Sequence, residues 1–332
     1  MACAFCGIST IRYNNLRKIL ISISTTTLLL IGCGVLTSIT QPLTSPTTTS
    51  TWTISPLQPT IEPATVTQTF SPTDTFTPPP TETLPPTFTF TPTLTPEPQW
   101  SFQGPGDVVV PILLYHHIGI SPSNSSYYVL PYEFEQQMYF LHEWGYQTIS
   151  VELMIKAIKE GTELPTKPII LTFDDGSDSI YTTAFPVLQK YNFTGTAYLV
   201  YNYIGAPSFV NIEEVQELYA AGWEIGSHGI SHIDLTKYPN KQEDEIVGSR
   251  QKLRNLLDIP ILTFAYPYGI YDEDSLYYVY YAGYIGAMGL GVDMHQGKNN
   301  QYYLYRREIK GSYNLKTFAS FLPWQGDLNN SR

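Results

Sequence analysis

Two groups of side chains, far apart in the sequence, combine residue types that together can bind a metal ion and move protons. Asp174 and Asp175 directly follow the apolar run 168–173, and His228 and His232 are four positions apart. That spacing would place both imidazoles on one side of a helical turn. One carboxylate and two imidazoles suit Zn²⁺ or a similar divalent ion and leave a coordination position open for water and substrate. The second carboxylate is then free to act as a base, which predicts a metal-assisted hydrolase.

Strand-like and helix-like segments alternate around these groups. The expected strands are 108–114, 168–173, 196–200, 223–226, 261–266 and one near Ile285, and the expected helices are 131–144, 179–190, 211–221, 238–257 and 272–282. Repeated β-α units with short connections predict an α/β fold with parallel strands, and about seven such units favour a closed barrel over an open sheet. Catalytic groups in such barrels collect at the C-terminal ends of the strands. Asp174, His228 and Tyr266 each follow or end a different expected strand, so we expect them to converge.

The first 36 residues have the composition of a targeting segment. Three basic residues, Arg12, Arg17 and Lys18, precede the mostly apolar run 19–36, in the order of a secretory signal. The sequence Leu-Ile-Gly-Cys that ends at Cys33 resembles the lipobox of bacterial lipoproteins, in which the cysteine is lipidated. An uncleaved signal anchor and plain secretion are the alternatives, because the run is about long enough to span a bilayer. We expect the rest of the chain to lie outside the cytoplasm, tethered to the cell membrane by a lipid or an anchor.

Residues 37–104 are dominated by threonine, proline and serine. Proline at this density removes hydrogen-bond donors and fixes φ, so neither helix nor sheet can propagate. The scattered apolar residues cannot offset the entropy lost on ordering the chain. We therefore predict a disordered, extended tether ahead of a folded domain at 105–332.

Charge and cysteine usage restrict the partners and the chemistry of the folded part. From residue 101 onward, 15 lysines and arginines face 25 aspartates and glutamates. An acidic domain repels phosphate backbones, which argues against nucleic acid as a partner. Cys3, Cys6 and Cys33 all lie in the targeting region. The folded domain is therefore expected to have no disulfide and no thiolate chemistry.

Three motifs of the folded part resemble those of the polysaccharide deacetylases, carbohydrate esterase family four, also known as the NodB-homology domain. They are Thr-Phe-Asp-Asp-Gly at 172–176, His-Gly-Ile-Ser-His at 228–232 and Phe-Ala-Tyr-Pro-Tyr-Gly at 264–269. Leu-Tyr-His-His-Ile at 114–118 is similar to the subgroup that includes poly-N-acetylglucosamine deacetylases, in which the barrel is permuted. The resemblance covers about residues 108–310 and implies a distorted (β/α)₇ barrel.

The resemblance also implies roles for the two groups of side chains described first. Asp175, His228 and His232 would bind the metal, most simply Zn²⁺, although Co²⁺, Mn²⁺ or Ni²⁺ would suit the same ligands. Asp174 would be the base that takes a proton from water.

Further roles follow for residues near these motifs. His116, from the early strand, would be the acid that protonates the leaving amine, because a histidine is the natural donor near neutral pH. Adjacent residues of a strand face opposite ways, so His117 is the second candidate for the acid or a residue behind the site. The backbone N–H of Tyr268 would stabilise the oxyanion, and Tyr266 and Tyr268 are candidates for stacking on sugar rings.

The sequence departs from the family pattern at three places. Many members have an arginine at the position of Ala265 that pairs with the base, and here Arg306 or Arg307 would have to replace it. Gly229 removes the hydroxyl that the family has at that position. The late leucine-x-histidine motif is missing, and His295 is a poor substitute for it.

The resemblance implies a metal-dependent hydrolase that removes N-acetyl groups from N-acetylhexosamine residues of a cell-wall or extracellular polysaccharide and releases acetate. One alternative is an O-acetyl polysaccharide esterase on the same scaffold. The other is a surface glycan-binding protein with weak or no catalysis, and Ala265 is its only support.

Overall fold

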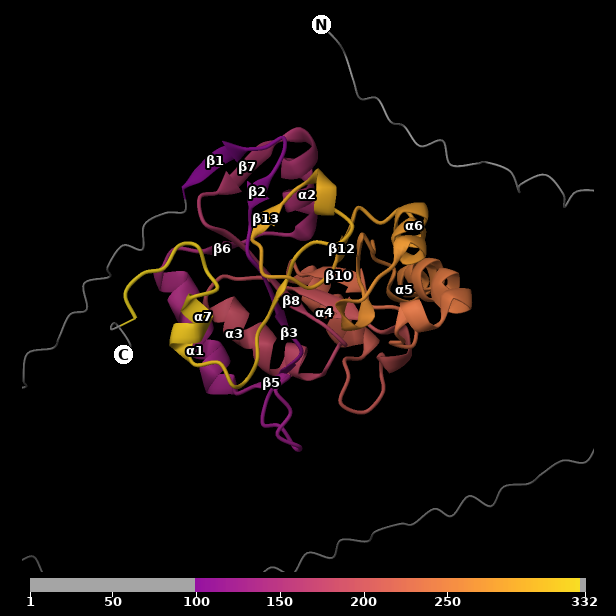
Figure 1. Ribbon diagram of the computed structural model, residues 1–332. Helices are drawn as coiled ribbons and strands as arrows, with labels where there is room; N and C mark the ends of the chain where they lie inside the picture. Colours follow the sequence, from indigo (N-terminus) through magenta and orange to yellow (C-terminus); the bar gives the residue numbers. More distant parts are fainter. Residues whose placement is uncertain (1–98, 329–332) are drawn as a thin grey trace, which may run out of the picture. The chain divides into compact units, whose positions relative to one another are not determined.

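The computed structural model describes residues 99–328 (Figure 1). The predicted targeting segment, Cys33 and nearly all of the predicted tether lie outside the described residues. None of the helices in the described part has the length and hydropathy needed to cross a membrane.

The domain is built around one parallel sheet. Its strands, in spatial order, are β12 (Gly286–Met288), β11 (Thr263–Ala265), β10 (Glu224–Ser227), β9 (Thr196–Leu199), β8 (Pro168–Phe173), β3 (Ile112–Tyr115) and β14 (Arg307–Glu308), and β6 (Gln147–Thr148) also pairs with the start of β8. Every pair in this sheet is parallel. All six residues of β8 are buried, as its mostly apolar sequence predicted.

The two ends of the sheet are joined by backbone hydrogen bonds. The N–H of Leu304 donates to the carbonyl of Ala287 at 2.8 Å, and the N–H of Gly291 donates to the carbonyl of Arg306 at 3.0 Å. The segment that leads into β14 therefore runs beside β12. The sheet curls into a distorted barrel, which confirms the predicted fold class.

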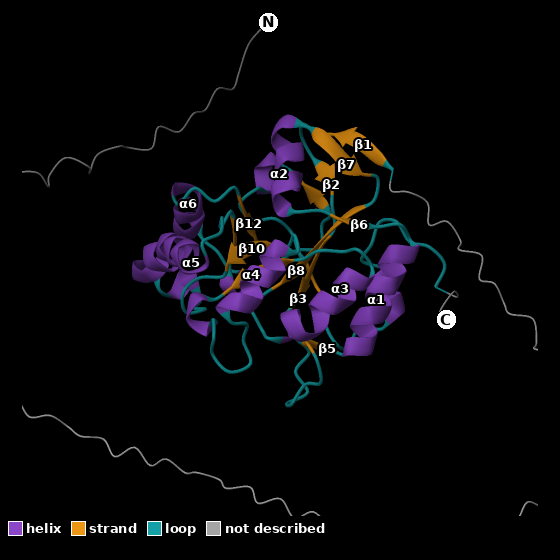
Figure 2. Cartoon of the chain, turned by 180° about the vertical axis from the view of Figure 1, so that it is seen from behind, coloured by secondary structure: helices purple, strands orange, loops and turns teal. Residues whose placement is uncertain are grey.

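Helices surround the sheet, as the view from behind shows most clearly (Figure 2). They are α1 (Pro131–Glu143), α2 (Val151–Glu160), α3 (Phe185–Lys190), α4 (Ile212–Ala220), α5 (Ser249–Leu257), α6 (Glu273–Tyr281) and α7 (Leu315–Ala319). Local sequence sets several of their starts. The Asn211 side chain accepts from the N–H of Glu214, whose carboxylate accepts from the N–H of Asn211. This capping box fixes the first turn of α4.

Three expected elements are interrupted in the structure. The helix predicted at 179–190 is divided into a π-helical turn at Ile180–Ala184 and α3. The strand predicted at 108–114 is divided into β2 (Val108–Val109), which pairs antiparallel with β13 (His295–Gln296), and β3. Pro111 lies between them, and its missing N–H prevents a continuous ladder. The helix predicted at 238–257 is likewise divided into a 3₁₀ turn at Pro239–Lys241, a π-helical turn at Asp244–Gly248 (η5) and α5.

The folded domain begins earlier than the predicted boundary at residue 105. Residues Trp100–Gln103 form β1, which pairs antiparallel with β7 (Thr162–Pro165) through four residue pairs. The sequence predicts these residues to belong to the tether because proline and threonine crowd the chain just before them. The partner strand β7, helices α2 and α7, and β14 were not predicted.

Glu224, at the start of β10, is expected to make the protein less stable at alkaline pH. Its Oε2 accepts a hydrogen bond from the N–H of Val151 at 2.7 Å, whereas Oε1 is buried without a partner. Burial raises the pKa of Glu224 from its ordinary value of 4.5 to about 7, although the bond from Val151 opposes the shift. The folded state therefore holds this proton more tightly than the unfolded chain. The stability that this gives is complete below pH 4.5 and is lost as the pH rises through about 7.

The substitution Glu224→Gln removes the charge and keeps an oxygen that can accept from Val151. We expect it to raise the free energy of unfolding by about 1–3 kcal/mol at pH 8 and by much less at pH 4, measured by urea denaturation. Glu160→Gln, at the exposed C-terminal end of α2, is the control. An equal effect at both pH values would contradict this account.

Candidate active site

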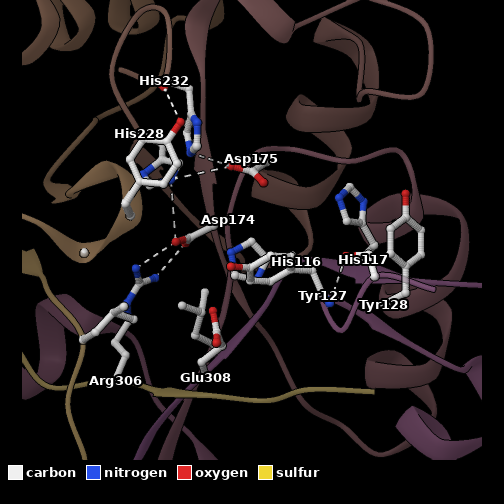
Figure 3. Close-up of a pocket in the computed structure, with 15 residues that line it drawn as sticks. His116, His117, Tyr127, Tyr128, Asp174, Asp175, His228, His232, Arg306 and Glu308 are labelled. Atoms are coloured by element: carbon white, nitrogen blue, oxygen red, sulfur yellow. Dashed lines mark hydrogen bonds and ion pairs between the residues drawn. The ribbon is translucent and has the colours of Figure 1, made fainter. Parts of the chain in front are cut away.

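The two predicted groups of side chains meet at the C-terminal ends of two strands of the parallel sheet, β8 and β10. Asp174 and Asp175 follow β8, and His228 follows β10, with β9 between them. Together with His232 they line one cavity of about 310 Å³. Figure 3 shows the four side chains directed toward one another.

The Asp-Asp-Gly sequence forms a tight turn that directs its two carboxylates to different partners. The N–H of Asp174 donates to the carbonyl of Tyr115 at 3.0 Å, which continues the pairing of β8 with β3 for one residue. Asp175 and Gly176 then have φ values of 71° and 79°. These left-handed conformations end the strand abruptly, and a non-glycine residue at φ 71° is uncommon enough to mark a constrained site.

The expectation that His228 and His232 share a helical turn is wrong. They lie on a loop after β10 in which Gly229 has a φ of 87° and His232 has a φ of 55°. A helix cannot pass through these conformations. The imidazoles nevertheless come together, with ring centroids 4.9 Å apart, because the loop turns back on itself. Glycine suits the backbone at position 229, where the family has a hydroxyl residue.

Asp175, His228 and His232 form a set of three potential metal ligands whose donor atoms lie within 4.8 Å of one another. Oδ1 of Asp175 lies 3.6 Å from Nε2 of His228 and 3.2 Å from Nε2 of His232. Nδ1 of His228 lies 2.7 Å from the carbonyl oxygen of Ala265. That contact assigns the proton to Nδ1 and leaves the Nε2 lone pair facing the carboxylates.

The chemistry of this donor set fits a divalent cation. Burial lowers the pKa of His228 to about 4 and also lowers that of His232, so both imidazoles are neutral ligands at neutral pH. Burial and the charge of Asp174 raise the pKa of Asp175 to about 7. Oδ1 of Asp175 is buried and accepts no hydrogen bond. A cation among these three residues would stabilise the ionised carboxylate and use that oxygen.

Arg306 holds Asp174 in a two-pronged ion pair. Its two terminal nitrogens contact Oδ1 at 2.7 Å and Oδ2 at 2.8 Å, and both side chains are almost completely buried. Burial alone would raise the pKa of Asp174, but the charge and hydrogen bonds of Arg306, together with the charges of His228 and His116, outweigh it and lower the pKa to about 2. Asp174 is therefore ionised at every physiological pH. Arg306 replaces the arginine missing at Ala265, as one of the two alternatives predicted.

Arg307 does not take part in the site. It is the next residue in the strand and lies on the other side, with its guanidinium 4.5 Å from the centre of the Phe321 ring. His295 is exposed and pairs with Asp293, so it does not replace the missing late histidine motif.

His116 and His117 both line the cavity, but in different surroundings (Figure 3). Nδ1 of His116 is buried without a partner, and the ring lies 4.8 Å from that of Tyr127. Burial lowers the pKa of His116, while the charges of Asp174 and Glu308 raise it. His117 stacks on Tyr128 at 4.3 Å between ring centres.

The two tyrosines predicted to contact substrate have different environments. Tyr268 is 56% exposed and lines the cavity, and its hydroxyl donates to the carbonyl of His232 at 3.3 Å. Tyr266 is fully buried, and its hydroxyl donates to the carbonyl of Tyr302. The prediction that Tyr266 contacts substrate is wrong, because this residue, which follows β11, is buried in the core.

The cavity contains residues that the sequence analysis did not single out. They are Leu114, Ser125, Tyr127, Tyr128, Gly269, Leu290 and Glu308. Glu308 lies in a two-residue strand that no periodicity could reveal. Only its position two residues after Arg306 could have indicated it, since alternate residues of a strand share a face.

A parallel barrel with these groups at its strand ends defines a barrel hydrolase, and comparison with known proteins identifies its family. The family model named polysaccharide deacetylase matches residues 161–287. YxkH of Bacillus subtilis strain 168, which carries the same family name, is 31% identical over 219 residues, covering 64% of this chain and 76% of YxkH. The chain therefore belongs to the polysaccharide deacetylase family.

Two further relatives agree with this assignment. The poly-β-1,6-N-acetyl-D-glucosamine N-deacetylase of Staphylococcus aureus strain MSSA476 is 26% identical over 196 residues, covering 54% of this chain and 67% of that protein. The structure of the Streptococcus pyogenes deacetylase PplD in complex with acetate has 27% identity and a TM-score of 0.59, covering 65% of this chain and 98% of PplD. His116 and Arg306 lie outside the range that the family model matches.

Proposed function

We propose that this polysaccharide deacetylase is a metal-dependent enzyme that removes N-acetyl groups from N-acetylhexosamine residues of a cell-wall or extracellular polysaccharide. The observation that carries the proposal is the buried Asp174–Arg306 pair beside three potential metal ligands. A protein that only bound glycan would have no need of an ionised, rigidly held carboxylate at that point. The Staphylococcus aureus relative, named as an N-deacetylase, supports an amide rather than an ester substrate.

The chain's own residues account for the proton transfers of amide hydrolysis. Asp175, His228 and His232 would hold the metal, which when bound polarises the acetyl carbonyl and acidifies a water. Asp174 is ionised and directed into the cavity, so its carboxylate can take the proton of the attacking water. His116 gives a proton to the nitrogen as the C–N bond breaks. The products are the free amine and acetate, the molecule present in the PplD structure.

The place of His116 among the residues that line the cavity supports its role as the acid. An acid must carry a proton before it can donate one. The charges of Asp174 and Glu308 raise the pKa of His116, but burial outweighs them and the pKa is lowered overall. The backbone N–H of Tyr268 remains the proposed oxyanion donor. Its φ of 62° and its exposed position at the cavity are in keeping with this role.

The location of the enzyme is proposed from the sequence alone. The basic and apolar composition of residues 1–36, with Cys33 in a lipobox-like sequence, supports a lipoprotein or a signal anchor. The Thr/Pro-rich tether would then let the domain reach a polysaccharide outside the membrane.

The test is acetate release by the full-length chain from N-acetylglucosamine oligomers, after metal removal and reloading with Zn²⁺. We expect release that depends on Zn²⁺ and disappears in Asp175→Asn. An O-acetylated xylan serves as the parallel substrate. Release from xylan alone would replace the proposal with an O-acetyl esterase, and glycan binding with no release under any metal would replace it with a binding protein.

Substitution of each adjacent histidine separates the acid from its neighbour. We expect His116→Gln to lower kcat by about 10²–10⁴-fold, because the amine would leave without a positioned proton donor. His117→Gln should change kcat far less, since that ring stacks on Tyr128. The measurement is steady-state acetate release with Zn²⁺ saturating. A larger loss in His117→Gln than in His116→Gln would reverse the two assignments.

A further inference from the structure

Glu245 lies directly behind the loop that joins the two histidine ligands. Its Oε2 accepts hydrogen bonds from the N–H of Ile230 at 2.7 Å and of Ser231 at 3.0 Å. Its Oε1 accepts from the hydroxyl of Ser231. All three contacts fall on the two residues at the centre of the loop, between Gly229 and His232.

The carboxylate of Glu245 is buried, and these loop contacts replace water around it. The residue is 5% exposed. In the described part of the chain, the ion pairs of lysine and arginine go to other carboxylates. A buried carboxylate without a cation persists only where hydrogen-bond donors surround it. Without Glu245, two N–H groups and one hydroxyl of the loop would lose their acceptor. Without the loop, the carboxylate of Glu245 would lose these donors.

Glu245 belongs to the π-helical turn η5, just before α5. Such turns insert one extra residue into a helix and are frequent at functional sites, because they redirect a single side chain. A Cβ at Gly229 would lie 3.0 Å from Oε2 of Glu245. The carboxylate of Glu245 therefore fills the space into which the side chain of a larger residue at position 229 would project.

The two histidine ligands are held by different means. His228 is fixed by the sheet, because its N–H donates to the carbonyl of Leu199 at 2.8 Å and its Nδ1 contacts Ala265. His232 follows two residues whose N–H groups both bind Glu245, and its own φ of 55° is unfavourable for a side chain larger than glycine. The position of the His232 ring relative to His228 and Asp175 thus depends on the loop that Glu245 holds.

We propose that Glu245 is a positioning residue for the metal site, which sets the placement of His232 by binding the backbone of the loop before it. The inference deepens the proposed function and relies on its metal ligands. Loss of Glu245 weakens metal binding without removing a ligand. Residues that orient the ligands of a metal site typically contribute about 10–100-fold to its affinity.

The test measures Zn²⁺ affinity of the full-length protein by competition with a chromophoric chelator. We expect Glu245→Gln to bind Zn²⁺ about 10–100-fold more weakly than the wild type. Glu243→Gln, two residues away and exposed, is the matched control and should bind as the wild type does. The visible absorption spectrum of the Co²⁺ form should also change in Glu245→Gln, because it reports ligand geometry. Glu245→Asp, with a shorter acidic side chain, should recover only part of the affinity.

A second variant keeps the inference open to refutation if Glu245→Gln does not fold. Ser231→Ala removes the hydroxyl donor and leaves both backbone contacts. It should lower Zn²⁺ affinity in the same direction by a smaller factor. Wild-type affinity in the folded variants, with acetate release intact, would overturn the inference and leave the function standing. Weakened Zn²⁺ binding in a protein that releases no acetate would overturn the function and leave the inference standing.

Discussion

Replacing Asp174 by asparagine is expected to lower kcat for acetate release by about 10²–10⁴-fold, the range that a positioned proton acceptor contributes. Asparagine has nearly the same shape as aspartate, but its amide cannot take a proton from water. Zn²⁺ affinity should stay close to that of the wild type, because the three ligands are Asp175, His228 and His232. The two quantities are measured as steady-state acetate release and as metal binding by calorimetry.

Asp175→Asn provides the matched comparison, since it makes the same change at the adjacent residue. It should lose metal affinity and activity together. The two variants thus distinguish the residue that acts as the base, Asp174, from the residue that binds the metal, Asp175. Loss of Zn²⁺ binding in Asp174→Asn with retention in Asp175→Asn would exchange the two roles.

Replacing Arg306 by methionine is expected to lower both stability and activity. The substitution leaves the carboxylate of Asp174, which is 2% exposed, without its cation. Removal of one partner from a buried ion pair typically costs about 3–5 kcal/mol. The base is also released from its fixed orientation, so kcat should fall well below that of the wild type. Urea denaturation and acetate release are the two measurements.

The double variant Asp174→Asn/Arg306→Met tests whether the unpaired charge is the cause. Neutralising Asp174 removes the buried charge, so the double variant should be more stable than Arg306→Met alone. Arg306→Lys keeps the positive charge but cannot contact both carboxylate oxygens, and it should fall between the wild type and Arg306→Met in activity. If the destabilisations of the two single variants simply add, the ion pair is not what stabilises this part of the barrel.

The barrel and the candidate metal-binding residues that come together in the structure could be predicted from the sequence because their signals are local. Strand β8 has the predicted bounds because five of its six residues are apolar and the Asp-Asp-Gly turn ends the run. The start of α4 was predicted to within one residue, and its Asn211 capping box accounts for the observed start. The two aspartates and two histidines were identified from their types and from the strands that they follow. These features depend on neighbours in the chain, which periodicity and turn chemistry can show.

The features that could not be predicted from the sequence depend on contacts between residues that are far apart in the chain. Arg306 and Arg307 were equal candidates, and only the pairing of β14 with β3 determines which of them faces Asp174. Tyr266 and Tyr268 were equal candidates for contact with substrate, but Tyr266 is buried in the core and Tyr268 lines the cavity. The turn of the histidine loop depends on Glu245, whose hydrogen bonds to it span 14 and 15 residues. No local pattern encodes such contacts.

The position of Arg306 has a consequence for how the enzyme matures. The arginine is 132 residues after the aspartate that it binds and directly precedes β14, the last strand of the sheet along the chain. While the chain leaves the ribosome, the loops that carry Asp175, His228 and His232 are made well before this strand. A chain that has lost its final segment, by early termination or by proteolytic trimming, would keep all three ligands but have no partner for its base. A chain that ends before Arg306 would therefore be expected to keep its metal ligands and to release little or no acetate.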